Sequence, residues 1–154
     1  MRFQILSIGQ KAPSWVAAGV RDYTDRLPAK LVQLVELPLA TRTRRSDSRR
    51  AQMEENQRLL KAIPAGARVV ALHPKGRALS TDMLAERMRD WLQDGRHVCF
   101  LIGGPEGLTE TTLAQSEEQW SLSQLTFPHM LVRVILAEQL YRGWTILQNH
   151  PYHR

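Results

Sequence analysis

The feature that most constrains the fold is a short, wholly apolar run that leads directly into glycines. Val98–Ile102 carries no charged or amide side chain, and Gly103-Gly-Pro-Glu-Gly107 follows it without a spacer. An apolar run of this length, bounded by turn residues, is typical of a strand buried on both faces of a parallel sheet. Loops at the carboxyl ends of such strands are where α/β proteins hold small ligands. The run therefore predicts an α/β fold with a ligand-binding loop directly after this strand.

Strand-like and helix-like segments alternate along the chain, which predicts a mostly parallel sheet flanked by helices. We expect one domain over residues 1–154. The expected strands span residues 2–8, 32–37, 68–72, 98–102 and 121–125, and residues 73–76 are expected to form a loop. The expected helices span residues 13–27, 80–95, 109–115 and 130–147, with a further helix from the arginine-rich segment 41–50 to about residue 63.

The charge of the chain is basic and unevenly distributed. The net charge is +6, and five arginines fall in one short segment that holds a single acidic residue: Arg42, Arg44, Arg45, Arg49 and Arg50. A basic surface favours polyanions, because neutralising phosphates releases their counterions. Such a segment is equally typical of a solvated loop, so an RNA contact and a solvated surface both stay open.

The sequence also bears on where the protein works. No apolar run reaches the ~18 residues of a membrane-spanning helix, and residues 1–8 lack the features of a signal peptide. Cys99 is the only cysteine and lies within the apolar run, so it cannot form a disulfide inside the chain. We therefore expect a cytoplasmic protein with no membrane segment.

The glycine-rich segment 103–107 is not a known nucleotide-binding motif. Its spacing differs from G-x-G-x-x-G, and it lacks the Lys-Ser/Thr pair of a P-loop, so neither site is expected. Glycines here fit a tight turn with positive φ. Two adjacent glycines after a buried strand also let a ligand approach the backbone closely, which favours a binding loop.

A second segment, residues 122–127, ends at Pro128 and has two interpretations. It can be an edge strand that the proline stops. It can instead be a loop whose free backbone groups bind the edge of an adenine. Apolar walls for the ring would then come from the side chains of Leu72, Leu122, Leu125 and Phe127.

The C-terminal helix and the tail after it carry further candidate residues. Glu138 and Arg142 are spaced i, i+4, and their face also holds Leu131, Val134, Ile135 and Tyr141, which suggests packing against another subunit. A separate stripe, Val132, Leu136, Leu140, Trp144 and Leu147, is expected to face the core. The tail contains His150-Pro-Tyr-His153. Two histidines three residues apart, with no carboxylate or cysteine close by, are poor evidence for a zinc site, so no metal is expected. Because Tyr152 and His153 lie far along the chain, near its C-terminus, we expect them not to support the core and to add little to stability.

Three segments in this order, 100–108, 120–129 and 149–154, resemble the RlmH family of ribosomal RNA large-subunit methyltransferases. These are SPOUT-class enzymes, and the resemblance implies a C-terminal trefoil knot, S-adenosylmethionine as the cofactor and a homodimer built on the C-terminal helix. Carried over residue by residue, the resemblance assigns cofactor binding to Leu72, Gly103, Gly104, Leu122, Ser123, Gln124, Leu125, Thr126 and Phe127.

The resemblance also implies the reaction, which is methylation of N3 of a pseudouridine in helix 69 of 23S rRNA, at position 1915, on the assembled ribosome. N3 must lose a proton, and negative charge spreads onto the flanking carbonyl oxygens. A cation such as Arg142 would stabilise that charge, and His153 or Glu138 would accept the proton. Tyr152 would orient or stack the base. The tail is expected to reach the active site of the partner subunit.

Two other functions remain open from the sequence. A basic ribosome-assembly factor that binds rRNA without chemistry would explain the charge but not the two loop segments. A metal nuclease built on His129, His150 and His153 would lack the carboxylates that such sites use.

Overall fold

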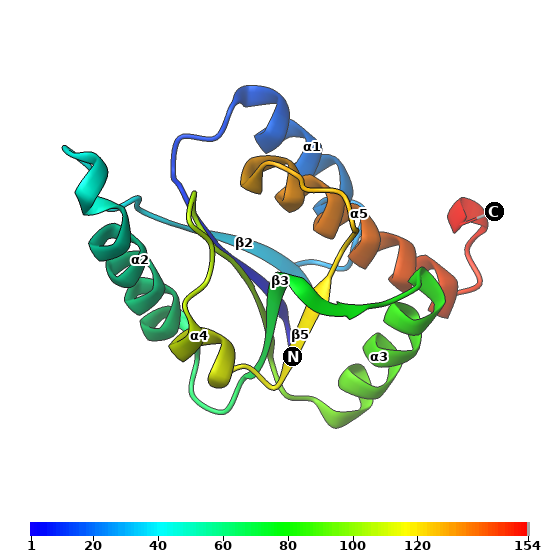
Figure 1. Ribbon diagram of the computed structural model, residues 1–154. Helices are drawn as coiled ribbons and strands as arrows, with labels where there is room; N and C mark the ends of the chain where they lie inside the picture. The colour runs from blue at the N-terminus through cyan, green and yellow to red at the C-terminus, as the bar shows by residue number, and fades with distance from the viewer. Residues whose placement is uncertain (154) are drawn as a thin grey trace.

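The structure, a computed structural model, describes residues 1–153, except for the side chain of His153 (Figure 1). Five strands form one sheet in the order β2-β1-β4-β3-β5, and every neighbouring pair is parallel. The strands are β1 (Phe3–Ile8), β2 (Val32–Leu37), β3 (Arg68–Ala78), β4 (Val98–Ile102) and β5 (Glu118–Ser121). The expected parallel α/β architecture is confirmed.

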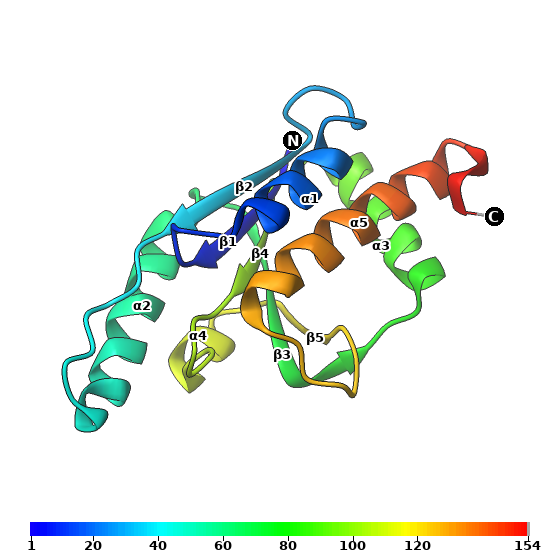
Figure 2. The same ribbon diagram turned by 90° about the horizontal axis from the view of Figure 1, so that it is seen from above.

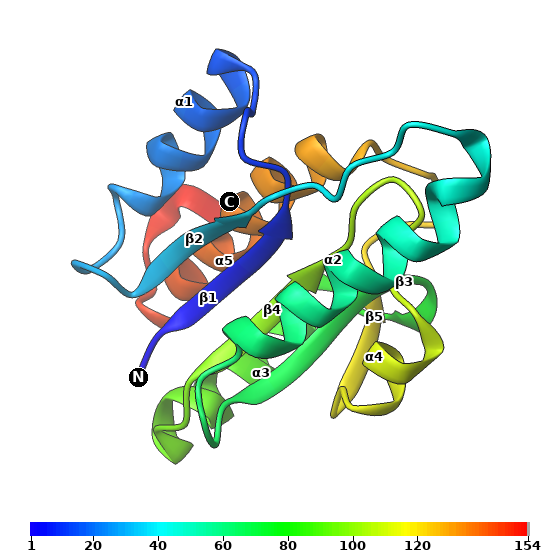
Figure 3. The same cartoon turned by 90° about the vertical axis from the view of Figure 1, so that its left-hand side faces the viewer.

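Helices cover both faces of the sheet (Figures 1 and 3). One layer holds α1 (Ser14–Thr24), α3 (Thr81–Asp94) and α5 (His129–Leu147), and the other holds α2 (Ser48–Ala62) and α4 (Glu110–Ala114). Short 3₁₀ turns, η1 (Arg45–Asp47) and η2 (Pro151–His153), precede α2 and follow α5. Figure 2 shows α5 between α1 and α3. Among the described residues, no helix is both long and apolar enough to span a membrane.

Strand β4 is buried on both faces because its side chains alternate between the two helical layers. Phe100 and Ile102 belong to the core beneath α3 and α5, while Cys99 and Leu101 belong to the core beneath α2. All five residues of the strand are buried, as the unbroken apolar run predicted. The loop after β4 is therefore attached to the most constrained strand of the sheet.

Two expectations about β3 and β5, at one edge of the sheet, are wrong. Residues 73–76 do not leave β3 as a loop, because the chain stays extended and pairs again with β5 after an irregularity between Leu72 and Arg77. Gly76 makes this possible, since a Cβ there would lie 2.7 Å from the backbone of Gln119. The fifth strand is Glu118–Ser121 rather than 121–125, and it is anchored by the buried Trp120.

The boundaries of α3 follow the expected chemistry. The Ser80 hydroxyl accepts a hydrogen bond from the Met83 backbone N–H at 3.2 Å, which caps the first turn. Gly95 ends the helix with φ of +81°, a conformation that favours glycine. The predicted α3 is confirmed to within a residue at each end.

The buried stripe of α5 differs from the expected one. Leu136 and Leu140 are buried, but Tyr141, which we expected on an intersubunit face, lies in the core at 5% exposure. The reason is that α5 packs against both α1 and α3, so its buried surface is wider than one stripe.

Arg133 is a fully buried arginine that joins α5 to the carboxyl end of β1. Its guanidinium donates to Ser7 Oγ at 2.8 Å, to the Ile8 carbonyl at 3.0 Å and to the Gly9 carbonyl at 2.6 Å. It also pairs with Glu36 at 2.6 Å. A buried charge needs this number of partners to offset its desolvation. Arg133 therefore fixes the first turns of α5 against the central strands.

Replacing Arg133 with Met should lower the free energy of unfolding by about 3–5 kcal/mol, because backbone carbonyls lose their buried donor. Urea unfolding followed by circular dichroism measures this. The matched control is Arg50→Met, because Arg50 is exposed and its nearest carboxylate contact is 3.9 Å. Equal midpoints for the two variants would contradict the role assigned to Arg133.

Candidate functional site

The loops that follow β4 and β5 enclose a pocket of about 520 Å³. This volume is in the range of small-molecule and cofactor sites. The pocket is lined by all nine residues that the sequence assigned to a cofactor: Leu72, Gly103, Gly104, Leu122, Ser123, Gln124, Leu125, Thr126 and Phe127. The lining also includes His73, Pro74, His129 and Val132, which sequence reasoning did not assign to it.

The glycines after β4 are required by the loop itself. A Cβ on Gly103 would lie 2.7 Å from the Gly107 carbonyl carbon, and a Cβ on Gly104 would lie 2.6 Å from Glu55 Oε1. The loop closes with a hydrogen bond from the Gly107 N–H to the Gly104 carbonyl at 3.0 Å. Side chains at these positions would therefore distort the pocket wall before they met any ligand.

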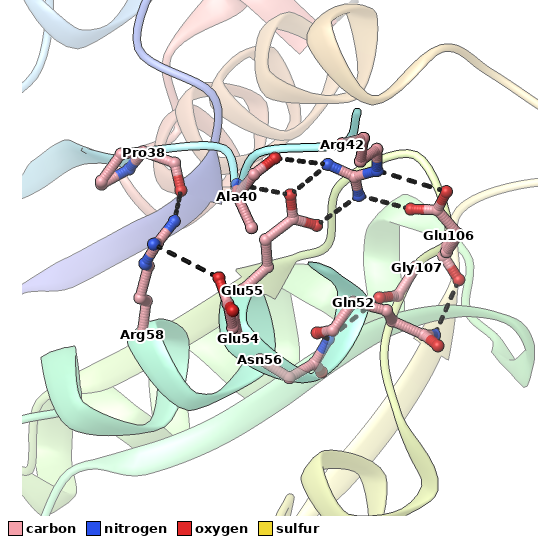
Figure 4. Close-up of polar contacts among 10 residues, drawn as sticks. All are labelled: Pro38, Ala40, Arg42, Gln52, Glu54, Glu55, Asn56, Arg58, Glu106 and Gly107. Atoms are coloured by element: carbon pink, nitrogen blue, oxygen red, sulfur yellow. Dashed lines mark hydrogen bonds and ion pairs between the residues drawn. The ribbon is translucent and has the colours of Figure 1, made fainter. Parts of the chain in front are cut away.

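A buried carboxylate holds this loop in place (Figure 4). Glu55 of α2 is 1% exposed and accepts hydrogen bonds from the Ala40 N–H at 3.0 Å and from the two Arg42 Nη atoms at 2.8 and 3.0 Å. Arg42 also pairs with Glu106 in the glycine loop. Its hydrogen bonds to Glu55 and Glu106 raise the pKa of Arg42, and Arg42 lowers the pKa of Glu106. The segment after β2, helix α2 and the glycine loop thus form one clamp.

Two amides of α2 complete the clamp. Gln52 donates to the Glu106 carbonyl at 2.9 Å and Asn56 donates to the Gly107 carbonyl at 3.1 Å. The Asn56 side-chain oxygen also accepts from the Thr109 N–H at 2.9 Å. Sequence reasoning missed these residues. The available indication was that Gln52, Glu55 and Asn56 share one face of a helix at i, i+3 and i+4, where apolar side chains are expected.

The second wall of the pocket, residues 122–127, is a loop and not an edge strand. Ser123 shapes it, since its hydroxyl accepts from the Leu125 N–H at 3.0 Å, while its carbonyl accepts from the Ser121 hydroxyl at 2.9 Å. The Leu125 side chain is 72% exposed although it lines the pocket. A large apolar side chain held in this position is available to a ligand.

His129 is one of the titratable groups of the pocket wall, together with His73 and Glu106. It begins α5, and burial followed by the charge of Arg133 lowers its pKa. A lowered pKa keeps the imidazole neutral at physiological pH. In this neutral form, one ring nitrogen can accept a proton or a hydrogen bond. His150 lies beyond the other end of α5, about 30 Å away along the helix, so the two cannot share one metal ion. Among the side chains that the structure describes, which do not include that of His153, no group of three potential metal ligands is present.

Three of the four predicted catalytic residues form a second cluster near the C-terminal end of α5. Arg142 pairs with Glu138 at 2.6 Å, and the Tyr152 hydroxyl donates to Glu138 at 3.3 Å. The Arg142 guanidinium lies 5.0 Å from the centre of the Tyr152 ring. The bonds to Glu138 raise the pKa of Arg142. The fourth residue, His153, has its side chain outside the described part of the structure.

Tyr152 packs against its own chain, which corrects the expectation that it lies too far along the chain to support the core. Its ring meets Tyr141 edge-on with 4.6 Å between centroids and joins the apolar core beneath α5. Burial, followed by a hydrogen bond with Tyr23, raises the pKa of Tyr152 to about 12. The phenol therefore stays protonated and neutral at physiological pH.

The pocket and the Glu138–Arg142–Tyr152 cluster do not meet within one chain. Val132 lines the pocket, and Arg142 follows it on the same helix after ten residues, which is about 15 Å of helix. None of the three cluster residues lines the pocket. The structure thus brings together the predicted cofactor residues and, separately, three of the four predicted catalytic residues.

Comparison with known proteins points to one family. A family described as "Predicted SPOUT methyltransferase" matches residues 1–153. The chain is 49% identical to ribosomal RNA large subunit methyltransferase H of Saccharophagus degradans, with both chains covered completely. It is 52% identical to the protein of the same name from Alkalilimnicola ehrlichii, over 100% of this chain and 99% of that one. A probable methylase family protein from Haemophilus influenzae has the same fold, with a TM-score of 0.60 at 13% identity, over 99% of this chain and 70% of that one.

Replacing Arg42 with Gln should loosen the glycine loop, because Glu55 and Glu106 both lose their cationic partner. Amide hydrogen exchange at residues 103–108 should become faster, while exchange in β4 stays slow. Arg58→Gln is the control, because Arg58 lies on α2 and donates to the Pro38 carbonyl without touching the glycine loop. Unchanged amide exchange at residues 103–108 in the Arg42→Gln variant would contradict the role of Arg42 in holding the glycine loop.

Proposed function

This chain belongs to the SPOUT methyltransferase family, and from that premise we propose that it transfers a methyl group from S-adenosylmethionine to large-subunit ribosomal RNA. The single observation that carries the proposal is the pocket that all nine predicted cofactor residues line, eight from the two loops and Leu72 from β3. We further propose that residues 1–154 act as one SPOUT domain in which the C-terminal segment forms the trefoil knot.

The residues of the pocket fit the proposed cofactor. Leu72, Leu122, Leu125 and Phe127 offer apolar walls for an adenine, and the loop backbone at 122–127 offers hydrogen-bonding groups to its edge. Bound there, S-adenosylmethionine would supply an electrophilic methyl group on a sulfonium. The task of the chain is then mainly to hold a nucleophile in line with that methyl group.

The proposed nucleophile is N3 of a pseudouridine in helix 69 of 23S rRNA. N3 must lose its proton, and the charge left on the flanking carbonyl oxygens needs a cation. Arg142 is the proposed cation, and its raised pKa keeps it charged throughout. Tyr152, a neutral phenol, would orient or stack the base. Glu138 and His153 remain the proposed proton acceptors, and the neutral His129 in the pocket wall is a further one.

We propose that the working site is composite and belongs to a homodimer. Arg142 lies about 15 Å along α5 from Val132 in the pocket of its own chain, so one chain alone does not place the proposed cation beside the methyl group. A second copy packed on α5 would bring the C-terminal half of its helix and its tail to the pocket. Each pocket would then be completed by the partner.

Leu125 allows a clean test of cofactor binding. Leu125→Ser should leave the fold intact, because the side chain is 72% exposed. It should weaken binding of S-adenosylmethionine about tenfold, since apolar area that the ligand would cover is lost. Isothermal titration calorimetry measures the affinity. Leu39→Ser is the matched control, because Leu39 is 47% exposed and does not line the pocket. Absence of binding by the unmodified chain would instead favour a basic assembly factor without chemistry.

Mixed dimers test the composite site. One chain carries Leu122→Arg, which puts a cation in the pocket wall, and the other carries Arg142→Gln. Each variant alone should be inactive in methyl transfer to ribosomes. In a mixed dimer, the intact pocket belongs to the Arg142→Gln chain, so its cation can come only from the partner. Recovered activity is expected. Persistent inactivity in dimers shown to be mixed would place Arg142 in the site of its own chain.

A further inference from the structure

We propose that three exposed arginines before and at the start of α2 bind phosphates of the RNA substrate beside the pocket. Arg44, Arg45 and Arg49 are called the arginine patch below. The proposal rests on the function proposed above and adds where the RNA backbone is held. It also separates these residues from the other two arginines of the same segment.

The five arginines of the segment have different surroundings. Arg42 has a side chain only 21% exposed and is committed to Glu55 and Glu106. Arg50 lies 4.0 Å from Asp47 and 3.9 Å from Glu54. The three residues of the arginine patch are exposed and have no ion-pair partner within residues 1–153. They are the part of the positive charge that is available to a partner.

The one acidic residue within the segment does not neutralise the arginine patch. A single carboxylate oxygen of Asp47 accepts from the Thr43 N–H at 3.0 Å, the Thr43 hydroxyl at 2.9 Å and the Arg44 N–H at 3.0 Å. These bonds lower the pKa of Asp47. Because this oxygen bonds Thr43 and the Arg44 backbone, Asp47 shapes the turn on which the arginine patch lies and does not pair with its guanidinium groups.

The position of the arginine patch is unfavourable for the helix. Helix α2 begins at Ser48 and has no acidic residue in its first turn. The N-terminal end of a helix carries partial positive charge, so cations placed there lower its stability. Arg49 lies in this first turn, and Arg44 and Arg45 lie just before it. Stabilisation of α2 therefore does not explain the arginine patch, whereas binding of polyanionic RNA does.

The clamp fixes the arginine patch beside the pocket. Arg42 and Gln52, on either side of the patch in the sequence, both bond Glu106, and Glu106 lines the pocket. In Figures 1 and 3 the turn before α2 projects at the same edge of the molecule as the loop that follows β4. A base held at the pocket would thus have the phosphates of neighbouring nucleotides within reach of guanidinium groups that bind phosphate well.

The test is the salt dependence of ribosome binding. Dissociation constants are measured between the full-length protein and purified, unmethylated ribosomes over a series of salt concentrations. Each of Arg44→Gln, Arg45→Gln and Arg49→Gln should reduce the slope of log affinity against log salt by about 0.7–0.9, which is one phosphate contact on RNA. The triple variant should lose roughly 2–3 units of slope and at least about tenfold in affinity at low salt.

The control removes the same charge from the other end of the same helix. Lys61 is exposed in the last turn of α2, about 18 Å from Arg49, and Lys61→Gln should keep the full slope. Affinity for S-adenosylmethionine should be unchanged in all these variants. Equal slopes for the triple variant and Lys61→Gln would overturn the proposal. Weaker binding without a change of slope would also overturn it, because the surface would then contact protein.

The test separates this proposal from the proposed function. One outcome is that the unmodified chain binds S-adenosylmethionine and methylates ribosomes while the triple variant keeps the full salt slope. In that case the proposed RNA-binding role of the arginine patch is wrong, and the proposed methyltransferase function stands. If the unmodified chain does neither but the variants lose slope, the arginine patch binds RNA and the methyltransferase function fails.

Discussion

The buried carboxylate of Glu55 is the constraint on which the rest of the site depends. A charge at 1% exposure is stable only with good partners, and here these are Arg42 and the Ala40 N–H. The same carboxylate leaves no room for a side chain on Gly104. One group therefore requires a glycine in the loop, an arginine after β2 and a fixed position of α2. The pocket wall and the arginine patch are both positioned by these requirements.

The sequence predicted best those elements whose own residues determine them. Val98–Ile102 forms a strand because five apolar residues need cover on both faces, and α3 has a serine cap and a terminal glycine. The predictions were wrong where contacts between segments distant in the sequence determine the local structure. Residues 73–76 contain proline and glycine but stay extended beside β5, and the fifth strand lies where Trp120 can be buried against Trp91. Leu122 and Leu125 favoured a strand because their exposure depends on a pocket that local pattern does not reveal.

The candidate site shows the same division. The nine predicted cofactor residues come mostly from two contiguous segments, and parallel strands bring such segments to one edge, so their meeting at a pocket follows from topology. The clamp could not be predicted in this way. Arg42, Glu55 and Glu106 come from three separate segments, and their contact depends on how α2 packs. The buried position of Arg133 at the end of β1 could not be predicted either, because nothing in its sequence neighbours indicates it.

Helix α5 explains why the proposed reaction needs two chains. A helix is a rigid spacer of about 1.5 Å per residue, so the pocket at its first turns and the catalytic cluster near its end cannot approach each other. The cluster is nevertheless ordered before any partner arrives. Tyr152 rests on Tyr141 and Arg142 is held by Glu138. A partner pocket would then receive groups whose rotamers are already fixed, and the conformational entropy of ordering them would not be lost on assembly. In the proposed dimer, Tyr152 is thus part of the fold of its own chain and would also complete the pocket of the partner.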